Sequence, residues 1–217
     1  MTDLFIGASK GFGLNLKNRR EESGHEVFHM SGSPSSRKSD LTIDWKTVKE
    51  SDIHRWIHQL PKIDFVFFNQ NSSSLSDASF HLCQHDTLKT WKQISHWRQS
   101  YYVSCQLPFQ IIHALGSKLD ETSCVCWALS SMVVKHNHDT KHADYIGNKF
   151  QNYMIMKNFS RYHPSCFIGF DPGSLSQESH ETKIQNLENI MVRPFGDIDG
   201  KVFDSNGNES ELYQVFC

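Results

Sequence analysis

"FIGASKGFGLNL", residues 5–16, decides the fold that we expect for this chain. Apolar residues run straight into Gly7, and Gly11 and Gly13 follow at short spacing. This pattern is typical of a strand that ends in a glycine-rich turn and continues as a helix. Because glycine lacks Cβ, such a turn can approach a phosphate closely, and the start of the helix would direct free N–H groups toward it. Glycine turns also connect strands to helices without any ligand, so the spacing alone leaves both interpretations open.

Outward from this turn, short apolar runs alternate with longer amphipathic segments. Strands are expected at residues 3–7, 25–30, 41–44, 63–71, 124–131, 166–173 and 201–204, and helices at 11–23, 45–60, 84–98, 101–119, 144–162 and 181–192. This βαβα order, with strands that are apolar almost throughout, predicts an α/β fold. The expected architecture is a doubly wound parallel sheet with helices on both faces, a three-layer αβα arrangement. No repeat or long linker interrupts the 217 residues, which predicts a single domain over residues 1–217.

Composition excludes several classes of function. The formal net charge is -2 and no polybasic segment is present, so a nucleic-acid partner is not expected. The longest apolar runs, at 65–68 and 124–129, are too short to span a bilayer, and the N-terminal residues lack the pattern of a signal peptide. We therefore expect a cytoplasmic protein without a membrane partner.

A metal site is the weaker interpretation of the histidine-rich stretch "KHNHDTKH", residues 135–142. His138 and His142 would share a face at i, i+4 spacing if the segment were helical, and could then bind a metal. Histidines in a polar loop more often contact solvent. No metal is therefore expected.

Polar and turn residues gather where the expected strands end. They are Gly7, Ser9, Lys10, Gly11, Phe12 and Gly13 after the first strand, Asp44 after the third, Asn69, Gln70 and Asn71 after the fourth, Ser130 and Ser131 after the fifth, and Pro172, Gly173 and Ser174 after the sixth. In open parallel sheets, ligands bind beyond the carboxyl ends of the strands. The sequence therefore predicts a ligand site at this edge of the sheet.

"YIGNK", residues 145–149, adds a chemical pair. Tyr145 and Lys149 are separated by four residues and would share one helix face. A neighbouring ammonium favours the phenolate and lowers the pKa of a tyrosine from its usual value near ~10. Such a phenol can exchange a proton with a substrate oxygen near neutral pH. Ser131, at the end of the preceding strand, would hold that oxygen, and Ser130 is its competitor for this role.

Taken together, these motifs resemble the short-chain dehydrogenase/reductase family over nearly the whole chain. "GASKGFG" resembles the glycine-rich cofactor motif, "LTID" the adenine-contacting strand end, and "NQN" the Asn-Ala-Gly motif of the family. "ALSS" followed by "YIGNK" resembles the catalytic Ser, Tyr and Lys, and "DPGSL" the Pro-Gly turn beside the nicotinamide. The resemblance implies a Rossmann-like NAD(P)-binding domain and an oxidoreductase that interconverts a carbonyl and an alcohol.

The resemblance also assigns roles to single residues. Tyr145 would be the general acid/base, Lys149 would bind the nicotinamide ribose and lower the pKa of Tyr145, and Ser131 would hydrogen-bond the substrate carbonyl. The cofactor-binding positions implied in this way are Gly7, Ser9, Lys10, Gly11, Phe12, Gly13, Ser31, Ser33, Asp44, Trp45, Asn69, Gln70, Asn71, Tyr145, Lys149, Pro172, Gly173, Ser174 and Leu175.

Three positions depart from the family pattern. Gln70 and Asn71 replace small residues, which would crowd the turn or add polar contacts near the cofactor. Ser104 stands where the family often has an asparagine in a proton relay, so a weaker relay is expected. These departures, together with a short segment after the Pro-Gly turn, are the reason for keeping a second hypothesis beside the oxidoreductase. In that hypothesis the chain is a cofactor-binding regulatory or interaction protein with little or no catalysis.

The end of the second strand bears on the choice of cofactor. NAD-binding relatives place an acidic residue there, but "HMSGSPSSRK" contains none before Asp40. Ser31 and Ser33 could bond a 2′-phosphate, and Lys10 adds a cation in the glycine turn. NADP(H) is therefore expected as the preferred cofactor, and NAD(H) is the alternative.

The substrate and the assembly are expected from the same resemblance. A short interval after the Pro-Gly turn suggests an open cleft for a small-molecule carbonyl or alcohol, including a bulky or carrier-bound one. Relatives commonly pair through the two helices that here span 101–119 and 145–162, which implies a homodimer or homotetramer. A related reaction on a sugar nucleotide is the third hypothesis, and the short chain argues against it.

Overall fold

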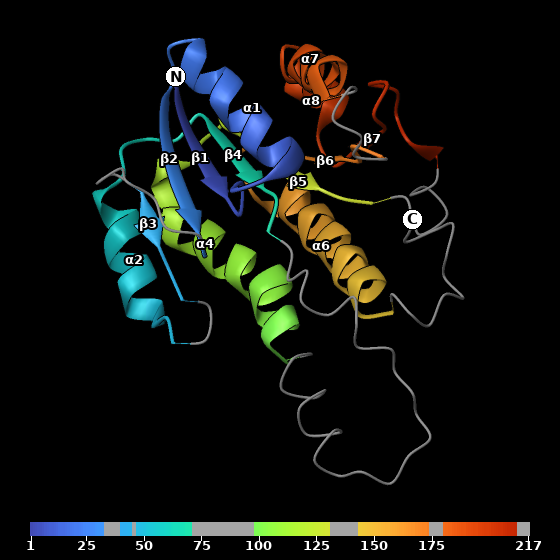
Figure 1. The fold of residues 1–217 in the computed structure, drawn as a ribbon. Coiled ribbons are helices and arrows are strands. Elements are labelled where there is room, and N and C mark those ends of the chain that lie inside the picture. Colours follow the sequence, from blue (N-terminus) through green and yellow to red (C-terminus); the bar gives the residue numbers. More distant parts are fainter. Residues whose placement is uncertain (33–39, 45–46, 71–97, 131–142, 174–179, 212–217) are drawn as a thin grey trace, which may run out of the picture.

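The strands of the computed structural model form one parallel sheet (Figure 1). The structure describes residues 1–32, 40–44, 47–70, 98–130, 143–173 and 180–211. Within them the strands are β1 (Thr2–Ile6), β2 (Glu26–Ser31), β3 (Leu41–Thr42), β4 (Phe65–Phe68), β5 (Cys124–Ala128), β6 (Cys166–Phe170) and β7 (Val202–Phe203). Their order is β3-β2-β1-β4-β5-β6-β7, so the winding reverses between β1 and β4. Ligands of such sheets bind at this reversal, beyond the carboxyl ends of the strands.

Helices cover both faces of the sheet, as Figure 1 shows. On one face lie α1 (Gly11–Glu22), α7 (His180–Met191) and α8 (Phe195–Ile198), and on the other α2 (Glu50–Gln59), α4 (Leu107–Leu115) and α6 (Ala143–Tyr162). A π-helical turn (Tyr102–Gln106) leads into α4, and a 3₁₀ turn (Gly116–Lys118) follows it. The doubly wound, three-layer αβα fold predicted from the sequence is therefore confirmed.

Side-chain alternation along the strands divides the core into two layers. In β1, Leu4 and Ile6 belong to the cluster under α2, α4 and α6, whereas Phe5 belongs to the cluster under α1 and α7. In β4, Phe67 packs beside Phe5 on the α1 side, with ring centroids 5.9 Å apart. Phe68 points to the opposite side and stacks on Trp127. Because both faces are buried, the central strands β4 and β5 are apolar throughout, which is the pattern seen in the sequence.

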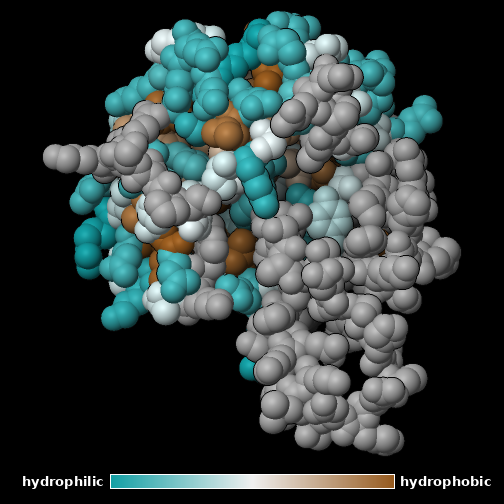
Figure 2. Space-filling model, in the orientation of Figure 1, coloured by the Kyte–Doolittle hydropathy of each residue, from teal (hydrophilic) through white to brown (hydrophobic). Residues whose placement is uncertain are grey.

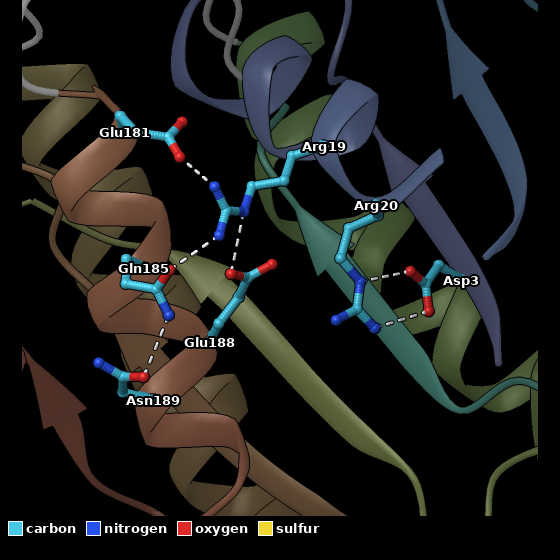
Figure 3. Close-up of polar contacts among 7 residues, drawn as sticks. All are labelled: Asp3, Arg19, Arg20, Glu181, Gln185, Glu188 and Asn189. Atoms are coloured by element: carbon cyan, nitrogen blue, oxygen red, sulfur yellow. Dashed lines mark hydrogen bonds and ion pairs between the residues drawn. The ribbon is translucent and has the colours of Figure 1, made fainter. Parts of the chain in front are cut away.

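Charged side chains fix α1 against its neighbours (Figure 3). The Arg20 guanidinium donates two hydrogen bonds, of 2.7 and 3.2 Å, to the buried carboxylate of Asp3 in β1. Arg19, one residue earlier, reaches α7 instead, where its partners are Glu181, Gln185 and Glu188. The direction of α1 is thus set from two sides, and with it the position of the glycine turn from which the helix begins.

Element boundaries differ from the sequence expectation at α2, which begins at Glu50 rather than at 45. The Asp44 carbonyl accepts the N–H groups of Thr47 and Val48, and Lys49 is extended. A turn therefore occupies the first part of the amphipathic stretch. The short helix α8 was not predicted, and most of the helix predicted at 84–98 lies outside the described residues.

The surface shown in Figure 2 is mostly hydrophilic over the described residues, with apolar residues in separate small areas. The large hydrophobic side chains that are exposed include Phe109 on α4 and Met154 and Tyr162 on α6. None of the helices within the described ranges is long and apolar enough to cross a membrane.

Candidate active site

The three glycines of the first turn have different structural roles. Gly7 has a φ of +77°, and a Cβ there would come within 2.4 Å of the Gln70 Cα. A Cβ on Gly13 would come within 2.6 Å of Asn69 Nδ2. Both glycines are therefore required for packing β1 and α1 against the end of β4. Gly11 differs, because it has a φ of +60° and its Cβ direction is open within 4 Å.

The start of α1 fits an anionic group in front of Gly11. Its N-cap residue, Lys10, is extended and exposed, its side chain makes no capping hydrogen bond, and the first turn contains no acidic residue. The first N–H groups of a helix have no partners within the helix, and the helix dipole places partial positive charge there. Phe12 would contribute only its backbone, because its side chain is buried and stacks on Phe170. Ser9 is half-buried in the same turn.

Lys149 connects α6 to the end of β5. Its Nζ donates a hydrogen bond of 2.5 Å to the carbonyl oxygen of Ala128 and lies 5.7 Å from the centre of the Tyr145 ring. Burial lowers the pKa of Lys149 to about 8, and the negative charge of Asp171 partly opposes this effect. The predicted pair therefore lies together at the carboxyl edge of the sheet.

The expected lowering of the pKa of Tyr145 by Lys149 is wrong for this geometry. The pKa of Tyr145 is raised, mainly because burial disfavours the phenolate, and the charge of Asp171 adds to the increase. A hydrogen bond with Ser130 acts in the opposite direction. The expected effect of Lys149 on the pKa of Tyr145 is missing because the Lys149 ammonium donates its hydrogen bond to Ala128 and lies over the ring of Tyr145. Ser130, the competitor of Ser131, thus contacts the Tyr145 hydroxyl, whereas Ser131 lies outside the described residues.

Asp171 is a site residue that the sequence analysis missed. It follows directly after β6, is buried, and its Oδ1 accepts the N–H of Gly173 at 2.9 Å. Its charge acts on both Tyr145 and Lys149. The sequence signal was available, because an acidic residue directly precedes Pro172 in "DPG".

A second polar cluster lies between the π-helical turn and α6. Asn148 donates a hydrogen bond of 2.8 Å to Ser100 Oγ, and the Cys105 thiol lies 3.7 Å from the Asn148 side-chain oxygen. Ser104 is buried in this turn, and its Oγ has no hydrogen-bond partner within the part of the chain that the structure describes. Asn148 directly precedes Lys149 in α6 and was not among the predicted site residues.

Asn69 and Gln70 hold the turn rather than face outward. Asn69 Nδ2 donates to the Gly7 carbonyl oxygen at 3.3 Å. Gln70 is buried against Gly7, and neither atom of its amide finds a partner among the described residues. The atoms of position 70 that lie nearest to Gly7 are its backbone and Cβ, so neither effect expected from the Gln70 side chain is tested.

The remaining predicted positions are less informative. Asp44 is exposed and accepts a hydrogen bond from Thr47 Oγ1, whereas Ser31 is buried at the end of β2. Pro172 is buried and Gly173 is exposed, with a φ of +62°. Predicted residues outside the described ranges are Ser33, Trp45, Asn71, Ser131, Ser174, Leu175, His138 and His142.

Chemically, the described residues bring together a glycine turn with an open helix start, a buried phenol hydrogen-bonded to a serine, and a buried ammonium. The glycine turn and the serine follow β1 and β5, and the phenol and the ammonium come from α6, where Lys149 is bonded to the end of β5. This arrangement can bind an anionic group at one place and exchange a proton with a substrate oxygen at the other.

Comparisons with known proteins give structural matches only. No protein-family model matches the chain, and no curated protein matches it. Among solved structures, a carbonyl reductase from Pseudomonas aeruginosa PAO1 is 17% identical, with a TM-score of 0.70 over 97% of this chain and 99% of that chain. A short chain dehydrogenase from Salmonella enterica is 14% identical, with a TM-score of 0.73 over 94% of this chain and 95% of that one.

A further match is a short chain dehydrogenase from Escherichia coli CFT073 complexed with NADPH. It is 16% identical, with a TM-score of 0.72 over 94% of this chain and 95% of that chain. The chain therefore has the fold of short-chain dehydrogenases/reductases over nearly its whole length.

Proposed function

We propose that this chain is a short-chain dehydrogenase/reductase: an NADP(H)-dependent oxidoreductase that interconverts a carbonyl and an alcohol. The observation that carries the proposal is the placement of Ser130, Tyr145 and Lys149 together at the edge of the sheet where the glycine turn ends. The same fold in dehydrogenases and a carbonyl reductase supports it.

Each residue of this set has a distinct task in the reaction. NADPH, when bound, would supply the hydride. The Tyr145 hydroxyl donates a proton to the substrate oxygen, and its raised pKa keeps that proton in place at neutral pH. Ser130, which hydrogen-bonds Tyr145, orients the same oxygen. Lys149, whose pKa of about 8 leaves it mostly charged near neutral pH, would hold the nicotinamide ribose.

The cofactor would contact the turn through backbone atoms. The N–H groups at the start of α1 would face the pyrophosphate, since Gly11 leaves the space in front of them open. The exposed Lys10 lies beside this space and would favour the additional phosphate of NADP(H) over NAD(H). The buried Ser31 is less accessible to a phosphate than Lys10.

The proposal includes a small-molecule carbonyl or alcohol substrate, with a bulky or carrier-bound one suiting an open cleft. It also includes a cytoplasmic location and a homodimer or homotetramer. Exposed apolar side chains on α4 and α6, among them Phe109 and Met154, support pairing through these two helices. Light scattering with size-exclusion chromatography tests the assembly, and a monomer would contradict that part of the proposal.

The activity is tested by following NADPH absorbance with a panel of aldehydes and ketones. We expect wild-type turnover and a loss of at least about 100-fold in kcat for Tyr145→Phe, with NADPH affinity retained. Tyr162→Phe is the matched control, because Tyr162 lies on the same helix and is 83% exposed. It should leave kcat unchanged.

Absence of turnover would have a specific meaning. NADPH binding without turnover, with Tyr145→Phe indistinguishable from wild type in cells, would favour a cofactor-binding regulatory protein instead. The observations that support this second candidate are the departures from the family pattern at Gln70 and Ser104, both of which are buried.

A further inference from the structure

Asp171 is a buried carboxylate whose position is fixed by backbone on both sides. It is 8% exposed. Its N–H donates to the Phe203 carbonyl oxygen of β7 at 2.8 Å, and its Oδ1 accepts the N–H of Gly173 at 2.9 Å. The neighbouring strand is in register, because Leu129 N–H donates to the Phe170 carbonyl oxygen at 2.9 Å. The carboxylate is therefore held at the end of β6, beside the end of β5 that leads to Ser130.

Asp171 follows β6 at the carboxyl edge of the sheet, next to the end of β5 against which Lys149 is anchored. It influences Lys149 and Tyr145, which both come from α6, and Lys149 is anchored to Ala128 at the end of β5. A proton and a hydride must reach the two ends of one carbonyl bond. The nicotinamide ring must therefore lie close to the Tyr145 hydroxyl, and hence near Asp171.

We propose that Asp171 stabilises the oxidised nicotinamide relative to the reduced one and thereby directs the site toward carbonyl reduction. This inference rests on the proposed function. The nicotinamide ring carries a positive charge in NADP⁺ and none in NADPH, so a carboxylate nearby favours NADP⁺. Burial makes that attraction stronger than it would be in water. A bound cofactor whose oxidised form is stabilised is a stronger hydride donor.

The reaction favoured in this way is balanced as follows. The hydride, with two electrons, moves from C4 of the ring to the carbonyl carbon, and the carbonyl oxygen takes a proton from the Tyr145 hydroxyl. The Tyr145 phenolate then regains a proton from solvent, so NADPH, a carbonyl compound and one proton give NADP⁺ and an alcohol. Asp171 also favours the protonated form of Tyr145 by raising its pKa, and the protonated phenol is the form that reduction requires. Both effects of this charge therefore act in the same direction.

Lys149 carries a positive charge near Asp171, which opposes the effect of the carboxylate. The experiment must therefore keep the protonation state of Lys149 constant. Near pH 7, below its pKa of about 8, Lys149 is mostly protonated. The dissociation constants of NADP⁺ and NADPH are measured there by calorimetry for wild type, Asp171→Asn and Asp171→Ser. Both variants keep a short side-chain oxygen for the Gly173 N–H. Asp199→Asn is the control, because Asp199 is a carboxylate that bonds the Phe167 N–H at the start of β6, far from this edge.

We expect the ratio of the NADP⁺ to the NADPH dissociation constant to increase about tenfold in both Asp171 variants and to stay unchanged in Asp199→Asn. A tenfold change corresponds to a positive shift of about 30 mV in the potential of the bound two-electron couple. A ratio within about twofold of wild type in both variants would overturn the inference and leave the proposed function intact. If the wild-type protein binds neither NADP⁺ nor NADPH, both the inference about Asp171 and the proposed function are overturned.

Discussion

The Lys149 ammonium donates a hydrogen bond of 2.5 Å to the carbonyl oxygen of Ala128. The residues belong to α6 and β5, and both are buried. The bond fixes α6 relative to the strand that ends in Ser130, and so fixes Tyr145 relative to that serine. It also keeps a cation in the interior, which lowers the pKa of Lys149 to about 8.

This lowered pKa predicts a specific pH dependence of stability. Between about pH 8 and about pH 10.5 the unfolded chain binds a proton at Lys149 that the folded chain does not, so the free energy of unfolding rises with pH. Relative to Lys149→Met, wild type should gain about 3 kcal/mol across this window. Urea unfolding of both proteins from about pH 7 to about pH 11 measures the gain. Parallel curves would contradict the assigned burial of the charge.

The glycine turn predicts unequal effects of two alanine substitutions. Gly7→Ala places a Cβ 2.4 Å from the Gln70 Cα at positive φ, and backbone there cannot yield cheaply. It should cost more than about 3 kcal/mol of stability. Gly11→Ala meets open space and should cost only about 1 kcal/mol, from its positive φ. Chemical denaturation compares them, and equal losses would contradict the different roles of the two glycines.

The two neighbouring arginines of α1 should also differ (Figure 3). Asp3→Asn leaves the buried Arg20 charge without its partner and should cost about 3 kcal/mol. Arg19→Ala removes contacts to α7 that are partly exposed, so the loss should be under about 1 kcal/mol. Urea unfolding midpoints of the two variants distinguish these values. A larger loss for Arg19→Ala would mean that the α1–α7 contact, rather than Asp3, holds the helix.

Ser130 should act on the pH profile of catalysis. Its hydrogen bond lowers the pKa of Tyr145, so Ser130→Ala should raise that pKa. Reduction needs the protonated phenol and should then persist to higher pH, while alcohol oxidation, which needs the phenolate, should begin at higher pH. The kcat itself should fall about 100-fold if Ser130 orients the substrate oxygen. Rates in both directions as a function of pH are the measurement, and an unchanged profile would assign the role to Ser131.

Much of the fold was predictable because β-rich apolar runs and the glycine turn are local signals. The strands at residues 3–7 and 25–30 and the helix at 144–162 were found within one or two residues of their observed bounds. The start of α2 was not, because the amphipathic pattern extends through the turn at Asp44 that precedes the helix.

The site was predictable as a set of residues but not as an electrostatic environment. Spacing placed Tyr145 and Lys149 on one helix face, and the structure brings them together. The direction of the Tyr145 pKa shift depends on burial and on Asp171, which follows the next strand along the chain and approaches only through tertiary packing. The hydrogen bond of Lys149 to Ala128 likewise depends on tertiary packing, so neither effect can be read from the motif alone.

Calorimetric titration with NADPH, NADP⁺, NADH and NAD⁺ tests the central claim most directly, on wild type and on Gly11→Ala. The account predicts saturable binding with preference for NADPH and NADP⁺. It also predicts affinity at least about tenfold lower in Gly11→Ala, since a Cβ enters the space reserved for the pyrophosphate while the fold is retained. No binding of any dinucleotide to wild type, or equal binding by Gly11→Ala, would contradict it.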